Sequence, residues 1–247
     1  MNAKLVPAFV MLFAALGPGA GRAAAHFQLL RPSADVVGAD DDKTVRLDLQ
    51  FTHPMQQGPV MNMAPPRRFG LLLAGRRSDL TGELKPRTLA GRAAYSCSVR
   101  IAAPGDYVFF LEPAPYWEPA ERKWIVHYTK VVVGAMGAEN GWDAMVGFPV
   151  EIEPLVRPYG LWTGNTFRGI VKHHGKPVPF ATIEVEYDNV GRRVKIPNDT
   201  LATQVVKADA AGTFAYTMPR AGWWGFAALI PIGCKYPLQQ TGRRFSR

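Results

Sequence analysis

Residues 45–51 read VRLDLQF, and apolar and polar side chains alternate strictly along this stretch. Successive side chains of a β-strand point to opposite faces, so the alternation predicts a strand with one buried and one solvated face. Further runs rich in apolar, β-branched and aromatic residues follow between glycines and prolines, at 69–74, 95–101, 106–111 and 124–133. These runs predict an antiparallel β-structure for the first half of the chain.

A second β pattern begins after a segment with two prolines at 154–160. Two strand-turn-strand patterns follow within 167–217, and their spacing suits a small antiparallel sandwich. Only 134–145 has room for a helical turn or two, and its glycines argue against more. We therefore predict an all-β protein made of two antiparallel, Ig-like β-sandwich domains, at 26–156 and 157–247.

The first 25 residues have the features of a signal peptide. A positive start with Lys4 precedes the uncharged run 5–16, a Gly-Pro-Gly segment breaks any helix, and three alanines at 23–25 suit a signal peptidase. The run is shorter than the about 20 apolar residues that a spanning helix needs. Cleavage after Ala25 is expected and would release a periplasmic protein; an uncleaved membrane anchor is the alternative.

The formal net charge of the chain is +9, and removal of Lys4 and Arg22 with the signal peptide leaves +7. The arginines are scattered in pairs rather than gathered in a stripe, which predicts a solvated surface and no nucleic-acid partner. Cys97 and Cys234 could pair in an oxidising compartment. Two cysteines form neither a disulfide framework nor a thiolate zinc site.

No catalytic motif is present: the chain has no GxSxG, no HExxH, no P-loop and no glycine-rich dinucleotide turn. We predict that the protein is not an enzyme, and no small-molecule substrate is identified. The chemistry-bearing residues that remain are nitrogen and sulfur donors, concentrated in the first half. They are His26, His53, Met55, Met61, Met63 and His127.

His26 would be the first residue of the mature protein. Its α-amine and imidazole can chelate one ion, and both groups titrate near neutrality, so a metal displaces the proton at little cost. The alternative is a flexible chain end that happens to begin with histidine.

His53 continues the inward parity of 45–51, and it is expected at the rim where the strand ends at Pro54. His127 lies among hydrophobic residues, and it is expected inside a strand. Together with His26 they would supply three nitrogen donors from separate segments, although a single histidine of this kind is more often a hydrogen-bonded core residue than a ligand. Met61 and Met63 carry soft thioethers that suit late metals, or they fill gaps in the core.

Three further features have plainer interpretations. The acidic run 40–42 lacks the spaced ligands of a calcium site and is expected to be a solvated turn. The pair at 173–174 is expected in a hairpin turn, with a surface metal contact as the alternative. Glu112, Glu118 and Glu121 surround an aromatic loop that would either cover a site or seal one end of a sandwich.

Several long motifs resemble one family. They are FTHPM at 51–55, EPAPYWEP at 112–119, HYTK at 127–130, RPYGLW at 157–162 and PRAGWWGFAA at 219–228. The chain resembles the DUF4198 family, periplasmic proteins linked to nickel and cobalt uptake, over nearly all of its mature length.

The resemblance implies a metal-binding protein that captures nickel or cobalt and presents it to the membrane subunits of an energy-coupling-factor type transporter. His26 matches the histidine with which the family's mature chains begin, and His53 and His127 match its other histidines. Met61, Met63 and Glu112 would be accessory groups near the ion. The second half is similar to a Cna-B type sandwich, which would be incomplete here because family members continue into a further strand.

Two alternatives to nickel or cobalt binding stay open. Divalent affinity rises towards copper at almost any nitrogen site, and thioethers hold copper(I), so a copper-binding periplasmic protein is one. The other is an envelope adhesion or interaction module without a metal, whose aromatic loops would bind a protein or a glycan.

Overall fold

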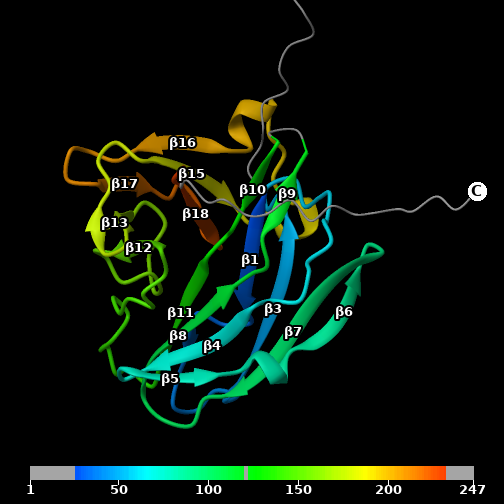
Figure 1. Cartoon of the computed structure of the whole chain (residues 1–247). Coiled ribbons are helices and arrows are strands. Elements are labelled where there is room, and N and C mark those ends of the chain that lie inside the picture. The colour runs from blue at the N-terminus through cyan, green and yellow to red at the C-terminus, as the bar shows by residue number, and fades with distance from the viewer. Residues whose placement is uncertain (1–25, 120–121, 232–247) are drawn as a thin grey trace, which may run out of the picture.

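The computed structural model describes residues 26–119 and 122–231, and these residues form β-sheets whose strand pairings are antiparallel, apart from one short parallel pairing of 36–37 with 134–135 (Figure 1). The predicted signal peptide, Cys234 and the chain end lie outside the described residues. Within the described ranges the helical elements are three short 3-10 turns, η1 (Thr81–Glu83), η2 (Val190–Arg192) and η3 (Asp199–Leu201). The segment 136–145 consists of turns, a bend and irregular chain, without a helix. None of the helices in these ranges is long and apolar enough to cross a bilayer. The all-β prediction is therefore confirmed.

The first half of the chain contains two larger sheets and a small hairpin. One sheet has the order β1 (Phe27–Pro32), β3 (Thr44–Thr52), β7 (Arg92–Arg100) and β6 (Lys85–Leu89). The other has the order β2 (Val36–Val37), β11 (Thr129–Ala135), β8 (Gly105–Glu112), β4 (Arg68–Leu73) and β5 (Arg76–Asp79). The hairpin consists of β9 (Tyr116–Glu118) and β10 (Lys123–Ile125).

Strand β3 confirms the prediction made for 45–51. Its four apolar residues there are at most 4 % exposed, whereas Arg46 is exposed and Asp48 is half-buried. The buried face packs into one core with residues of the other sheet, among them Phe69, Phe109 and Val133. The alternation thus decided which side of β3 faces the second sheet.

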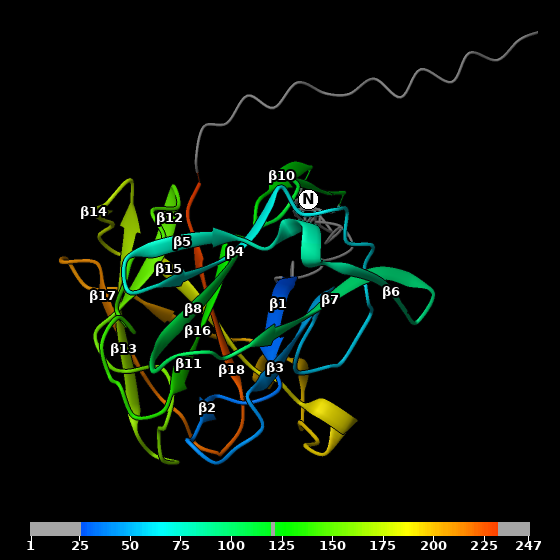
Figure 2. The same ribbon diagram turned by 90° about the horizontal axis from the view of Figure 1, so that it is seen from below.

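The second half of the chain contains two further sheets around a core of their own. One consists of β12 (Val150–Pro154), β13 (Thr166–His173), β14 (Lys176–Pro177) and β17 (Thr213–Thr217). The other has the order β16 (Gln204–Lys207), β15 (Thr182–Tyr187) and β18 (Trp224–Leu229). Both views place these strands together, away from β6 and β7 (Figures 1 and 2). Their core includes Phe167, Val171, Ile183 and Phe214.

Strand β12 bears on the predicted domain boundary between 156 and 157. It lies on the N-terminal side of that boundary, yet it pairs with β13, from Val150 opposite His173 to Pro154 opposite Gly169. The chain has therefore already joined the sheets of the second half by residue 150. The division into two domains stays a prediction.

Polar contacts from β1 and from the turn that follows β3 join the two halves. Arg31 forms a bidentate ion pair with Asp188, at 2.5 and 2.7 Å. The buried carboxylate of Glu186 accepts a hydrogen bond from the backbone nitrogen of Met55 at 3.1 Å, and Asn189 Nδ2 donates to the Met55 carbonyl at 3.1 Å. Burial raises the pKa of Glu186. The turn next to His53 is thus held by β15 and the residues after it.

Tyr159 covers part of the outer face of the β11 sheet, and its hydroxyl donates to the buried Asp106 at 2.5 Å. This ring lies so close to Gly134 that a Cβ there would overlap it. We expect Gly134→Ala to lower the free energy of unfolding by about 1–3 kcal/mol, because the Tyr159 ring must move. Urea unfolding measures the change. Gly82→Ala is the control, since no atom lies within 4 Å of a Cβ there; equal losses in both variants would contradict the account.

Candidate metal centre

His26 and His53 are brought together by the pairing of β1 with β3. Phe27 lies opposite Thr52, so the residue before β1 stands next to the residue after β3. The two imidazole centroids are 4.5 Å apart. His53 is 7 % exposed, as its continued inward parity predicts, and His26 is half-buried.

His127 approaches the same place from a third segment. It does not lie inside a strand, as was expected: the run 124–133 divides into β10 and β11, and His127 lies in the connection between them. The chain has to leave the β9–β10 hairpin there to join β8, which explains the break. The rings of His26 and His127 both pack against Phe51, with centroids 5.6 and 5.1 Å from its centroid.

The electrostatic state of His127 suits a metal ligand. Burial, and secondarily the charge of His26, lowers the pKa of His127 to about 4. The imidazole is therefore neutral at neutral pH, which is the form that binds a metal. Its Nε2 atom is buried and has no hydrogen-bond partner among the described residues. Such an atom in a folded protein calls for an explanation, and a bound ion is one.

Glu118 joins the three histidines, although it was not among the residues predicted for the site. It lies at the end of β9, is 6 % exposed, and its Oε2 is 3.0 Å from Nδ1 of His26. An α-amine and imidazole of one histidine chelate an ion through Nδ1, because Nδ1 closes a six-membered ring. In the full-length chain the His26 nitrogen is a peptide nitrogen. After cleavage, an ion held by His26 would therefore meet the Glu118 carboxylate directly.

The other predicted accessory groups have partners of their own. Met63 is buried in the core and its sulfur accepts a hydrogen bond from Gln28 at 3.4 Å, which fits the packing interpretation. Met61 is partly buried against the same core, and its backbone nitrogen donates to Phe51 at 2.9 Å. Glu112 forms an ion pair with Arg68 at 2.7 Å. Their roles near an ion stay predictions.

The acidic run and the histidine pair are placed as their plainer interpretations predict. Asp41 accepts a hydrogen bond from the Gly38 nitrogen at 2.7 Å, and Asp42 accepts one from Thr44 at 2.9 Å, so both carboxylates serve a surface turn. His173 and His174 lie at the β13–β14 turn with centroids 4.5 Å apart. Among the described residues, no three His, Cys, Asp or Glu side chains already stand in the geometry of a metal site.

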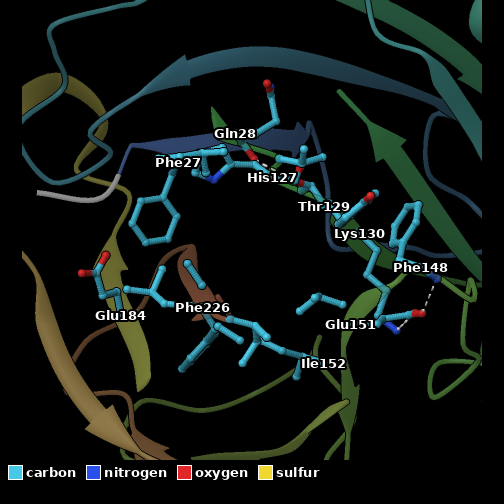
Figure 3. A pocket seen from close by; sticks show the side chains of 18 of the residues that line it. Phe27, Gln28, His127, Thr129, Lys130, Phe148, Glu151, Ile152, Glu184 and Phe226 are labelled. Carbon is cyan, nitrogen blue, oxygen red and sulfur yellow. Dashed lines mark hydrogen bonds and ion pairs between the residues drawn. The ribbon is translucent and has the colours of Figure 1, made fainter. Parts of the chain in front are cut away.

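A pocket of about 990 Å³ adjoins the histidines, and His26 and His127 form part of its wall. Figure 3 shows Phe27 and His127 on one side of it and Phe226 and Ile152 on the other, so both halves of the chain contribute. At one end, Lys130 forms an ion pair with Glu151 at 2.6 Å.

Glu151 is a carboxylate of the pocket wall that has several hydrogen-bond partners. Besides Lys130, it accepts hydrogen bonds from the backbone nitrogens of Val146, Gly147 and Phe148, at 2.8 to 3.1 Å. Burial lowers the pKa of Lys130, and Glu151 opposes this shift. The pair is thus a desolvated junction that holds the segment 146–148 against the β11 sheet.

The fold and these residues define an all-β protein in which His26 contacts His53 and Glu118, and packs on the same phenylalanine as His127, beside a large pocket. The chain belongs to the family described as a domain of unknown function, DUF4198, which it matches over residues 23–231. No curated protein matches it by sequence.

Three solved structures illustrate how distant its structural likenesses are. Native α2-macroglobulin of Escherichia coli, domains MG0-NIE-MG1, is 8% identical, with 87% of this chain and 69% of that chain covered and a TM-score of 0.24. Dimeric latent PorU of Porphyromonas gingivalis is 14% identical, with 82% of this chain and 19% of that chain covered and a TM-score of 0.22. SGBP-B of Bacteroides ovatus, in complex with a mixed-linkage heptasaccharide, is 11% identical, with 79% of this chain and 50% of that chain covered and a TM-score of 0.18. Scores this low carry no argument about function.

Proposed function

We propose that the protein binds a divalent transition metal, nickel or cobalt, outside the cytoplasm and delivers it to the membrane subunits of an energy-coupling-factor type transporter. The observation that supports this best is that His26 contacts the imidazole of His53 and shares Phe51 with His127, so three histidines from separate segments lie around the same ring. Imidazole nitrogen is a ligand suited to nickel and other late metals. We further propose that the two pairs of sheets are two sandwich domains, and that the first holds the ion.

The ligand set in this proposal has four donors from the protein. They are the α-amine and Nδ1 of His26, an imidazole nitrogen of His53, and Nε2 of His127. Glu118 lies within 3.0 Å of His26 Nδ1 and would either ligate the ion or orient that imidazole. Copper would fit the same nitrogens, so the choice among these metals rests on supply and on the transporter.

An alanine inserted before His26 in the mature protein should abolish nickel binding, because the amine of the new residue cannot chelate together with the His26 imidazole in the same ring. Calorimetric titration with nickel measures the loss, and mass spectrometry verifies each N-terminus. The melting temperature of the metal-free protein should not change. Unchanged affinity in the inserted variant would refute the role of the N-terminus.

An interaction module without a metal is the second candidate, and one observation favours it. Trp117 is 37 % exposed and packs against Trp124 across the β9–β10 hairpin, with centroids 5.5 Å apart. An exposed tryptophan that is supported by a second, partly buried one suits binding of a protein or a glycan. Dialysis of the mature protein against nickel, followed by elemental analysis, separates the two: no retained ion would favour the interaction module.

A further inference from the structure

The pocket beside the histidines is far larger than a metal ion requires. Its volume is about 990 Å³, whereas a single water molecule occupies about 30 Å³ in the liquid. Pockets for organic ligands of drug size span roughly 300–1,000 Å³. The size of this pocket therefore matches an organic molecule rather than a hydrated ion.

The pocket walls are mainly apolar and come from both halves of the chain. The large side chains that Figure 3 shows around it are Phe27, Phe148, Ile152 and Phe226, and Phe167 also lines it. The charged groups Lys130 and Glu151 neutralise each other at one end, as Figure 3 shows. An occupant would therefore have to place an apolar body, with rings or alkyl groups, in the centre of the pocket.

Two polar groups of the wall come from β10 and from the connection that follows it. His127 Nε2 and the indole Nε1 of Trp124 are both buried and lack a hydrogen-bond partner within the described part of the chain. Both residues line the pocket, and so does His26. Two of the three imidazoles, those of His26 and His127, are consequently part of the wall of the apolar pocket, so a ligand in the pocket would lie beside them.

We propose that the pocket takes the apolar body of a small organic chelator, so that the metal reaches the histidines as a chelate complex and not as the hydrated ion. The inference rests on the proposed function. The chelator would fill part of the coordination sphere, and the imidazoles of His26 and His127 would replace water on the side that faces them. No covalent bond forms or breaks in the chelator.

Calorimetry on the exported protein with its mature N-terminus tests the proposal. The titrants are hydrated nickel, the equimolar nickel–bipyridine complex, and bipyridine without metal. Burial of two aromatic rings should make the complex bind at least about tenfold more tightly than hydrated nickel. Metal-free bipyridine should bind more weakly than the complex, because it lacks the bonds to the imidazoles.

Substitutions that fill the pocket should remove this advantage. Leu229 lines the pocket at the end of β18 and is 41 % exposed, so Leu229→Trp can be accommodated without disturbing a core. Ile152→Trp fills the pocket from β12. In both, the ratio of the two nickel affinities should fall towards one. Val205→Trp is the control, since Val205 is 59 % exposed on β16 and does not line the pocket.

Each outcome decides between the proposals. A tenfold advantage that Leu229→Trp removes and Val205→Trp keeps supports the chelator pocket. A complex that binds no better than hydrated nickel overturns it and leaves the proposed function standing. Binding of neither form overturns the proposed function. Metal-free bipyridine that binds as tightly as the complex also overturns the inference, because the pocket would then act independently of the metal.

Discussion

Lys130→Met is expected to lower the free energy of unfolding by about 3–5 kcal/mol, because it leaves a buried carboxylate without its counter-ion. The side chains of Lys130 and Glu151 are 14% and 3% exposed, and their charged atoms are 2.6 Å apart. The three backbone N–H groups that donate to Glu151 remain in the variant. These hydrogen bonds still stabilise part of the negative charge of Glu151. The loss of unfolding free energy is therefore expected at the lower end of the range.

Urea unfolding and a thermal melt of the metal-free protein measure this loss. Lys172→Met is the matched control, since Lys172 pairs with Glu153 at the same 2.6 Å distance but with side chains 21% and 28% exposed. That variant should lose less than about 1 kcal/mol. A double variant, Lys130→Met with Glu151→Gln, should recover part of the stability, because the uncompensated charge is removed. Equal losses for Lys130→Met and Lys172→Met would contradict the prediction, because the Lys130–Glu151 pair would then be as accessible to water as the Lys172–Glu153 pair.

Strands in which apolar and polar residues alternate could be predicted from the local sequence, whereas β1 could not. In β3 each apolar residue of 45–51 faces the core, so the pattern and the burial agree. In β1 the polar Gln28 is buried, because its side chain donates to the Gln50 carbonyl at 3.1 Å and to the Met63 sulfur. A buried glutamine breaks the alternation, and only the neighbouring strand satisfies it. Tertiary contacts therefore determine β1.

The sequence predicted the three histidines of the candidate site, but it did not predict the carboxylate of Glu118. His53 follows from the parity of β3, which a local pattern encodes. Glu118 contacts His26 only because the β9–β10 hairpin folds back over the start of β1, and 91 residues separate the two positions. The sequence does show Glu118 between Trp117 and Pro119 in an aromatic loop. Nothing in that loop shows which end of the sheet it covers.

The turn after His53 also depends on contacts with residues that are distant in the sequence. Glu186 and Asn189, far along the chain, hold the backbone of Met55 on both its nitrogen and its carbonyl. The second half thus supports the loop that carries one of the three histidines. No spacing rule connects residues 55 and 186, so only the folded chain reveals that the two halves meet beside the site.

His127→Leu is expected to weaken nickel binding by about 100-fold, or about 2.7 kcal/mol, through loss of one nitrogen donor. The same change should leave the metal-free protein as stable as before, or more stable. The His127 Nε2 atom is buried without a partner among the described residues, so the native fold bears the cost of desolvating it and gains no hydrogen bond in return. Leucine fills a similar volume and removes that cost.

Calorimetry with nickel and a thermal melt of the apo form measure the two effects. His173→Leu is the control, because that imidazole lies at the β13–β14 turn in the other half of the chain and should affect neither quantity strongly. A hydrogen-bonded core histidine would give the opposite result at position 127: lower apo stability and unchanged nickel affinity. If His127→Leu raises the stability of the metal-free protein and abolishes nickel binding, His127 serves metal binding at the expense of stability. A histidine that served the fold would instead stabilise the protein.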